Sequence, residues 1–496
     1  MKNQFNELAK SLAQSASRHG ALKQFGVGLA SVAMAGLLTL PAGANDLRLG
    51  PLVELSRPNA VAGCDDGLVL PGPYTLDDAA EPFVAANPIN PRNIVAAWIQ
   101  GPFQNIVSAA SFDGGRTWQQ RTIPLTPCSG GPYLGAGDPW LSFSPNGDLY
   151  AIAVAGDSFD NPSVVVNKST DGGLNWGAAS IIYVPPDEIT AGDKPSITAD
   201  PKNPKFVYAV WEVYASSDGV GDHTVFARTT DGGKSWEPAR TIFSPPLDND
   251  DTAPQIAVLP AGTLVCLISE SSVNKTTGDP EFSLAVIRSS DRGRTWSARI
   301  SLAQQFWQPV TDLENGQTVR SYLHSLAVDP RNGNLYVVWE DSRFSHGQNN
   351  SIAFSMSADG GLHWSTPIPI NQTPRRIPQG NQQAFLPSIA VAADGTIGVS
   401  YYDFRFNDRR PGLPTDHWLV QYHPSRRAPA TNPANWGDEV RLTPESFDME
   451  QAWSPTFEYF VGDYEGLTAI GNDFVTAFNG VDRDNVTSIF FRRIER

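Results

Sequence analysis

The chain has 496 residues, a formal net charge of −16 and an isoelectric point near 4.9. Such an acidic chain is a poor partner for nucleic acids and for anionic membranes, so both classes of partner are excluded. It contains 43 glycines, 40 prolines and 13 tryptophans, and no long stretch after the N-terminus shows helical periodicity. This composition predicts an all-β protein built from many short strands and turns.

The first 44 residues have the pattern of an export signal. An apolar run over residues 25–40 follows the basic residues Lys2, Lys10, Arg18 and Lys23. Ala42-Gly43-Ala44 then has the small-x-small form of a cleavage site. A membrane anchor is the alternative, but the run is short for a spanning helix and ends in Pro41. We expect cleavage near Ala44 and a secreted or periplasmic mature chain without a membrane span, whereas Sec and twin-arginine export both stay open.

An octamer of the form S/T-x-D-x-G-x-x-W recurs along the chain. Its five copies are about 60 residues apart and span residues 111–118, 169–176, 229–236, 289–296 and 357–364. Their aspartates are Asp113, Asp171, Asp231, Asp291 and Asp359, and their tryptophans are Trp118, Trp176, Trp236, Trp296 and Trp364. A fixed period of this length indicates a repeat architecture.

Each octamer follows an apolar run and precedes a polar or β-rich run, which predicts two strands joined by a tight glycine turn. Glycine adopts positive φ without steric cost, and the aspartate can accept hydrogen bonds from the N–H groups of its own turn. The tryptophan can pack between strands. We therefore expect the octamers to be structural and to carry no chemistry.

The octamer resembles the Asp-box, or bacterial neuraminidase repeat, of sialidase-type β-propellers. In that family the motif lies on a hairpin on the face away from the active site. The resemblance implies a β-propeller and suggests an exo-sialidase type of activity, although the motif is much more specific for the fold than for the activity.

Two predicted strands precede each octamer, and two further modules without an octamer follow, starting near Pro387 and Glu465. The pattern thus predicts seven modules of four strands, of which the last lacks its fourth. Residues 51–56 can supply that strand, close the ring and hide the sheet edges. We predict a single seven-bladed propeller over residues 45–496. The alternative is a six-bladed ring with a satellite module, because sialidases of the family have six blades.

Only three cysteines occur. Cys266 lies in an apolar run and is expected to be a buried thiol. Cys64 and Cys128 flank the first module in loops, and export favours a disulfide between them. Three dispersed cysteines do not predict a metal site.

Two related phrases fall on the face opposite the octamers, each at the end of a strand. They are Asp341-Ser342-Arg343 and Asp403-Phe404-Arg405. One interpretation is a site in which Arg343 and Arg405 grip an anionic group and Asp341 or Asp403 transfers a proton. The other is that each aspartate pairs with its own arginine and pins the loop.

Acidic residues also gather where the first strands of the modules begin. They are Glu81, Asp138, Asp193, Asp250, Asp251, Asp463 and Glu465. Converging near the axis, such carboxylates can bind Ca²⁺ or raise the pKa of one carboxyl group for acid catalysis. The alternative is a solvated acidic rim. No other cofactor is expected.

Sialidases, which the chain resembles, use three arginines, a Tyr–Glu nucleophile pair and an aspartate acid/base, an exception among glycosidases. By its place on the face, Tyr464 is the candidate nucleophile. The family's F/Y-R-I-P motif is missing near the start of the domain, and Arg376-Ile377-Pro378 lies in a later connection. Arg343, Arg405 and Tyr464 are therefore candidates by position and not by motif.

The leading hypothesis is a secreted, monomeric, sialidase-like glycoside hydrolase acting on an extracellular glycan or glycoprotein. The alternative is a non-catalytic propeller that binds a glycan or a protein through the same face. A Tyr–carboxylate pair converging with arginines would favour the enzyme. An aromatic platform of Trp307, Phe344, Phe404 and Trp453 would favour the binding protein.

Overall fold

A computed structural model describes residues 47–64, 75–101, 103–158, 161–188, 190–215, 222–246, 249–425, 427–454 and 458–496. The chain divides into two compact units, Met1–Leu47 and Arg48–Arg496, and the second contains all of the described strands. The predicted export signal over residues 1–44 lies outside the described residues. No helix within the described ranges is long and apolar enough to cross a membrane.

Most of the described strands form antiparallel sheets in which each strand pairs with the next along the chain. The first two sheets contain β3 (Ala79–Ala86), β4 (Ile94–Gln100), β5 (Asn105–Ser111) and β6 (Gln119–Thr122), then β7 (Gly135–Phe143), β8 (Leu149–Gly156), β9 (Ser163–Ser169) and β10 (Ser180–Tyr183). The third and fourth contain β11 (Thr190–Ala199), β12 (Val207–Ala215), β13 (His223–Thr229) and β14 (Arg240–Phe243), then β15 (Asp250–Val258), β16 (Leu264–Val273), β17 (Pro280–Ser289) and β18 (Ile300–Gln305).

The fifth and sixth sheets contain β21 (Ser325–Val328), β22 (Leu335–Asp341), β23 (Ser351–Ser357) and β24 (Ile368–Pro369), then β25 (Ala384–Val391), β26 (Ile397–Asp403), β27 (Pro414–Tyr422) and β28 (Trp436–Arg441), with β29 (Phe447–Asp448) on β27. The seventh contains β31 (Gly466–Ile470), β32 (Asp473–Val481) and β33 (Thr487–Glu495). The N-terminal strands β1 (Arg48–Leu49) and β2 (Val53–Glu54) both pair with β33, so the expected closing strand is split in two.

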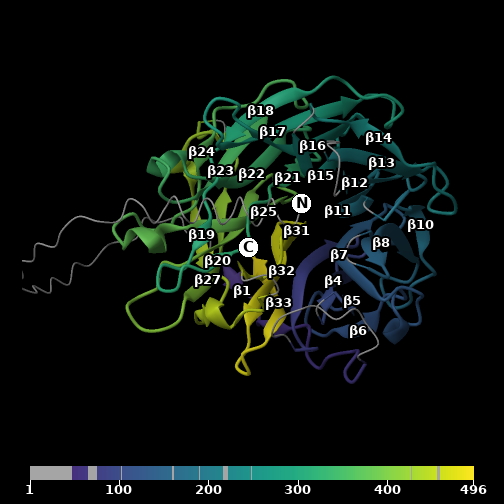
Figure 1. Ribbon diagram of the computed structural model, residues 1–496, viewed down its shortest axis with the longest axis horizontal. Coiled ribbons are helices and arrows are strands. Elements are labelled where there is room, and N and C mark those ends of the chain that lie inside the picture. Colours follow the sequence, from purple (N-terminus) through teal and green to yellow (C-terminus); the bar gives the residue numbers. More distant parts are fainter. Residues whose placement is uncertain are drawn as a thin grey trace, which may run out of the picture. The chain divides into compact units, whose positions relative to one another are not determined.

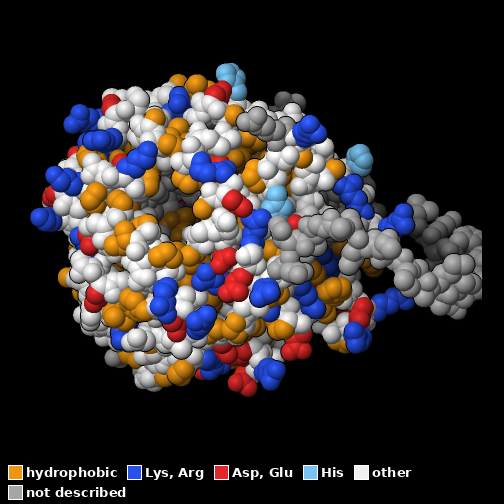
Figure 2. Space-filling model, turned by 180° about the vertical axis from the view of Figure 1, so that it is seen from behind, with side chains coloured by type: hydrophobic (Ala, Val, Ile, Leu, Met, Phe, Trp, Pro, Cys, Tyr) orange, Lys and Arg blue, Asp and Glu red, His pale blue; other side chains and the backbone are white. Residues whose placement is uncertain are grey.

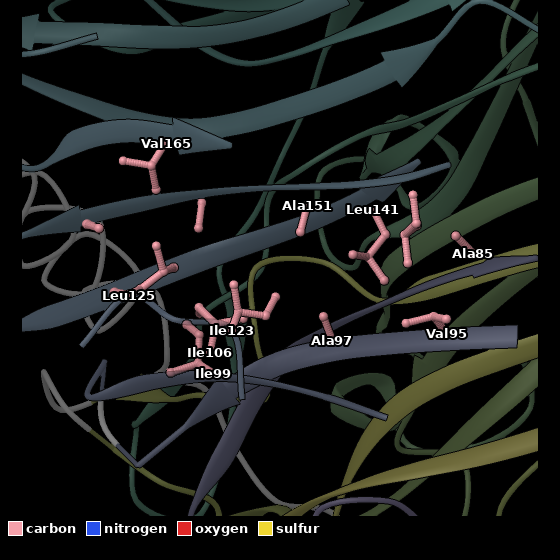
Figure 3. Close-up of a cluster of buried hydrophobic side chains, with 14 of the residues drawn as sticks. Ala85, Val95, Ala97, Ile99, Ile106, Ile123, Leu125, Leu141, Ala151 and Val165 are labelled. Atoms are coloured by element: carbon pink, nitrogen blue, oxygen red, sulfur yellow. The ribbon is translucent and has the colours of Figure 1, made fainter. Parts of the chain in front are cut away.

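The sheets follow one another around a common centre in chain order, and the first strand of each contacts the first strand of the next (Figure 1). Strand β31 of the last sheet contacts β3 of the first, which closes the ring. This arrangement is the β-propeller predicted from the sequence, and seven sheets of the described part of the chain take part in it. The hydrophobic core lies between neighbouring sheets. Figure 3 shows one such cluster, in which side chains from the first and second sheets meet.

The octamers form the tight turns that the sequence predicts. In the third copy, Asp231 Oδ1 accepts hydrogen bonds from the backbone N–H groups of Lys234 and Ser235, both at 3.0 Å, and from the Thr229 hydroxyl at 2.8 Å. Because these donors stabilise the carboxylate, led by the Ser235 hydroxyl, they lower the pKa of Asp231 to about 2. The other four aspartates accept equivalent hydrogen bonds, and the five tryptophans pack against the core clusters.

The second glycine of the octamer also fits against the preceding sheet. Gly233 has φ 82°, and a Cβ placed on it would lie 2.8 Å from the ring of Tyr150 on β8. Gly173 and Gly293 meet Val95 and Phe226 of their preceding sheets in the same way. Each of these turns therefore joins two neighbouring sheets, in addition to joining two strands.

The N-terminal segment is tied to the first sheet by a disulfide. Cys64 and Cys128 form this bond, with their Cα atoms 5.8 Å apart, and they are the pair expected from the sequence. Cys266 is a free, buried cysteine on β16. Because β1 and β2 complete the last sheet, the disulfide links both sides of the ring closure.

Substituting Gly233 with alanine tests this packing. Gly233→Ala introduces a Cβ in a positive-φ conformation and against Tyr150, whereas Gly262→Ala introduces one at φ 86° with no atom within 4 Å. We expect each to lose about 1 kcal/mol of stability from backbone strain, and Gly233→Ala to lose about 1–3 kcal/mol more from overpacking. Differential scanning calorimetry measures both. Equal losses would contradict the packing role.

Candidate functional site: an ion cluster at the centre of the ring

A bulge interrupts the first strand of five sheets at an X-Pro step. The residues before the prolines have positive φ: Glu81 (56°), Asp138 (55°), Lys194 (44°), Ala253 (49°) and Leu386 (52°). The register of each strand with its neighbour shifts at this step. Positive φ is costly for residues with a Cβ, and bulges of this kind re-aim a side chain. In the first three sheets the re-aimed side chain is charged.

Lys194 lies at the centre of a group of buried carboxylates. Its Nζ binds Asp463 Oδ2 closely and lies 3.3 Å from Asp138 Oδ2 and 3.6 Å from Glu81 Oε1. Arg320 Nε binds the other oxygen of Asp463 at 2.8 Å. The side chains of Lys194 and of the three acidic residues that its Nζ contacts are at most 6% exposed. The Arg320 side chain is 29% exposed. We call these five residues the axial cluster.

Proton occupancy differs between neighbouring carboxyl groups of the cluster. Burial and the charge of Asp138 raise the pKa of Glu81 well above its ordinary value. Burial alone would raise the pKa of Asp138 as well, but the Lys194 ammonium group, the largest opposing effect, lowers it overall. Glu81 therefore holds a proton beside an ionised Asp138.

Asp193 extends this pair toward the solvent. Burial raises its pKa to about 7, against the effect of Lys194, and its carboxyl group is hydrogen-bonded to that of Asp138. It is only partly buried. Near neutral pH, Asp193 therefore exchanges a proton while Asp138 remains ionised, which is the pairing that acid–base chemistry requires.

A small sheet places Arg320 in the cluster. It consists of β19 (Val310–Thr311), β20 (Thr318–Val319) and β30 (Glu458–Tyr459), the last parallel to β20. Asn315 Nδ2 donates to the Tyr459 hydroxyl at 2.8 Å, and the Arg320 guanidinium lies 5.4 Å above the Phe460 ring. These contacts hold the partly exposed Arg320 guanidinium against Asp463.

Tyr464 lies beside the axial cluster, as the sequence suggested, but its hydroxyl donates to the Pro139 carbonyl at 2.8 Å. Burial, followed by the nearby carboxylates, raises its pKa well above the ordinary value, so it is a neutral phenol. Its role as a nucleophile stays a prediction. A cavity of about 100 Å³ beside the cluster is lined by Asp463, Tyr464 and His324 among others. That volume holds a few water molecules and is too small for a sugar.

In each of the two Asp-x-Arg phrases, the arginine forms an ion pair with its own aspartate. Arg343 Nε donates to Asp341 Oδ1 at 2.8 Å, its Nη2 donates to Oδ2 at 2.7 Å, and Trp339 Nε1 donates to the same Oδ2 at 2.8 Å. The carboxylate of Asp341 is fully buried. These contacts match the alternative in which the aspartate pins its own loop.

The second phrase is bound even more closely. Arg405 Nε donates to Asp403 Oδ2 at 2.6 Å, its Nη1 donates to Glu439 at 2.6 Å, and its guanidinium lies 3.6 Å from the centroid of the Trp418 ring. Burial raises the pKa of Asp403 to about 6 although Arg405 opposes the shift. With both guanidinium groups occupied, the geometry favours loop pinning over a grip on an anionic ligand.

The predicted acidic residues converge only in part. Glu81, Asp138 and Asp463 meet in the axial cluster, but around an ammonium group. Glu465 instead accepts a hydrogen bond from Tyr402 at 2.5 Å. Among the described residues, no group of three or more His, Cys, Asp or Glu side chains is arranged to hold a metal ion, and calcium binding stays a prediction. In the predicted aromatic platform, Phe404 and Trp453 are buried at 1% and 3% exposure.

Sequence reasoning missed Lys194, Arg320 and Tyr322. Lys194-Pro195 repeats the step of Glu81-Pro82 and Asp138-Pro139, which is a signal that could have revealed it. Arg320 and the half-buried Tyr322 lie in a connection between sheets that has no repeat pattern.

Comparison with known families supports the repeat. Residues 205–406 match the family model described as the BNR repeat-like domain. The predicted resemblance to the sialidase-like BNR superfamily is thereby confirmed. A search of curated protein sequences finds no match.

Several solved structures are similar to this chain. A Hadza microbial sialidase is 15% identical with a TM-score of 0.45, covering 80% of this chain and 72% of its own. A protein of unknown function from Dyadobacter fermentans is 14% identical with a TM-score of 0.45, covering 90% and 99%. An α-L-arabinanase of Penicillium chrysogenum is 16% identical with a TM-score of 0.44, covering 86% and 96%. At these values the likenesses do not bear on activity.

Removing the central cation tests the axial cluster. Lys194→Met removes the ammonium group between the buried, ionised Asp138 and Asp463, and we expect a loss of about 3–5 kcal/mol of unfolding free energy. Lys234 is exposed, so Lys234→Met serves as the control with the same change of charge. Chemical denaturation compares the two variants. Losses of equal size would contradict the central role of Lys194.

The shifted pKa values also predict how stability depends on pH. The folded protein holds protons on Asp193, Asp222 and Asp251, whose pKa values burial raises to about 7, 8 and 7, up to a higher pH than the unfolded chain does. Stability therefore falls as pH rises from about 4 to 8. The octamer aspartates act in the opposite direction, because lowered values such as that of Asp231 lose stability as pH falls below about 4. We expect the melting temperature to peak near pH 4–5. A steady rise from pH 5 to 8 would contradict this.

Proposed function

We propose that the protein is a glycoside hydrolase that acts on extracellular glycans and uses Asp193 and the axial cluster. One observation carries the proposal: Asp193, partly exposed and with a pKa near 7, is hydrogen-bonded to Asp138, which Lys194 keeps ionised. The BNR repeat match supports a superfamily that includes glycoside hydrolases. The predicted export signal supports an extracellular substrate.

Hydrolysis of a glycosidic bond adds water across it and requires a proton for the departing sugar oxygen. In the proposed mechanism Asp193 donates this proton, and Asp138 holds the Asp193 carboxyl group in place through their hydrogen bond. Water then supplies the replacement proton to Asp193 when it adds to the sugar. Arg320 and Tyr322, both partly exposed beside the cluster, are placed to bind substrate hydroxyl groups.

Turnover of a panel of fluorogenic glycosides, sialosides included, tests the proposal. We expect Asp193→Asn to lower kcat at least 100-fold without changing the melting temperature by more than a few degrees, because general acid catalysis contributes about 10²–10⁴-fold. Activity should fall as pH rises through about 7, where Asp193 loses its proton. Asp279→Asn, an exposed carboxyl on the same face, is the control. Full activity of Asp193→Asn would rule out its proposed role.

A non-catalytic glycan-binding or protein-binding propeller is the second candidate. The observation that favours it is that the guanidinium groups of Arg343 and Arg405 are occupied by carboxylates. In that case the folded protein would turn over no glycoside across a broad pH range, yet would bind a glycan or protein ligand with Asp193→Asn unaffected.

A further inference from the structure

A second group of carboxyl groups extends outward from Asp193 across the third and fourth sheets. Asp193 lies opposite Glu212 in the pairing of β11 with β12, and Asp251 lies opposite Glu270 in the pairing of β15 with β16. The full group, which we call the acidic arc, is Asp193, Glu212, Asp222, Asp250, Asp251 and Glu270. Asp222 precedes β13 and interacts with Asp250, Asp251 and Asp193, so the arc is continuous.

Among the described residues, two oxygens of the arc are buried without a hydrogen-bond partner. Asp251 is 1% exposed and Asp222 is 9% exposed, and no described residue donates to the Oδ1 atom of either. The other oxygen of Asp251 accepts a hydrogen bond from Thr224. Buried acceptors without a donor are costly, so each of these atoms would be stabilised by a donor that a ligand supplies.

Few cations face the arc in the described part of the chain. Arg299 binds Glu270 at 2.5 Å, and Lys194 interacts with Asp193 from the axial cluster. His223 directly follows Asp222 in the chain. Burial and then the charge of Asp251 raise the pKa of the Cys266 thiol. Bound protons neutralise part of the negative charge of the arc instead, because burial raises the pKa of Asp222 to about 8 and that of Asp251 to about 7.

We propose that the acidic arc binds the ammonium group of an amino sugar, so that the glycan taken by this site carries free amines. An ammonium group has three N–H donors and a compact positive charge, which match unpaired carboxylate oxygens. An anionic sugar would be repelled by the same groups. This inference rests on the proposed function and names the substrate class of the same site, because Asp193 belongs to both the arc and the proposed proton donor.

Proton release distinguishes this mode of binding. When the ligand's ammonium group enters, it replaces protons held on the arc, and these pass to the buffer. The heat of binding then depends on the ionisation enthalpy of the buffer. A neutral sugar bound by hydrogen bonds alone would release none.

Isothermal titration calorimetry of the whole protein at pH 7 tests the inference. The glucosamine trimer is compared with the N-acetylglucosamine trimer, which differs only in the blocked amines. We expect the free amine to bind at least 10-fold more tightly, to release protons and to weaken with added salt. Asp222→Asn and Asp251→Asn should each weaken its binding at least 10-fold.

Asp279→Asn is the matched control, because it removes one exposed carboxylate from the same face outside the arc. Circular dichroism and the melting temperature establish that each variant is folded. If Asp279→Asn loses as much affinity as Asp222→Asn, the attraction is nonspecific and the inference is overturned. Equal affinity for both trimers overturns it too, as does equal, arc-dependent binding of a trilysine peptide.

The outcome is separable from that of the proposed function. Arc-dependent binding of the glucosamine trimer without any hydrolysis supports the arc and contradicts the hydrolase. Hydrolysis of neutral or anionic glycosides with no preference for free amines supports the hydrolase and overturns the arc as the determinant of substrate class.

Discussion

The ammonium group of Lys194 is the contact on which the centre of the molecule depends. It contacts carboxyl groups of the first and second sheets and of the segment before the seventh, while its own backbone belongs to the third. Without a cation there, the ionised Asp138 and Asp463, each at most 3% exposed, would repel each other in a medium of low polarity. The same charge keeps Asp138 ionised, and the exchangeable proton therefore sits on Asp193. One ion thus sets the protonation of the neighbouring carboxyl groups at the centre of the ring.

The backbone makes this cluster possible. A regular first strand would point successive side chains to alternate faces, between the sheets. The X-Pro bulge adds a residue, and the positive φ before the proline turns that side chain away from this alternation. Where the residue is Glu81, Asp138 or Lys194, the result is a charged centre, whereas the same step in the fourth and sixth sheets holds the uncharged Ala253 and Leu386. Strain at these five steps is compensated by the surrounding sheets.

The two ends of the sheets have different roles. The octamer turns contain satisfied carboxylates and glycines that fit against the preceding sheet, so they stabilise the ring. The opposite ends hold the axial cluster and the acidic arc, where Asp193, Asp222 and Asp251 have raised pKa values and some oxygens lack a partner among the described residues. The face in Figure 2 shows acidic and basic side chains interspersed, in contrast to the arc, where carboxyl groups predominate.

The sequence by itself determined the repeat. The spacing of the octamers and the strand pairs before them predicted the four-stranded sheets, the propeller and the N-terminal closing segment, because turn chemistry and strand alternation are local properties. The disulfide was predicted from the positions of the three cysteines and from the export signal, because exported proteins can form disulfides. The two Asp-x-Arg phrases were visible in the sequence, but their roles were not decided, because a sequence does not tell whether an arginine already has a partner.

Only the tertiary structure decided the site. Glu81, Lys194, Arg320 and Asp463 are far apart in the chain and lie in different sheets or connections, and they meet because the ring curves back on itself. Their protonation depends on burial and on one another's charge, which no local pattern encodes. The same holds for Asp222 and Asp251, whose unpaired oxygens exist only where the third and fourth sheets adjoin.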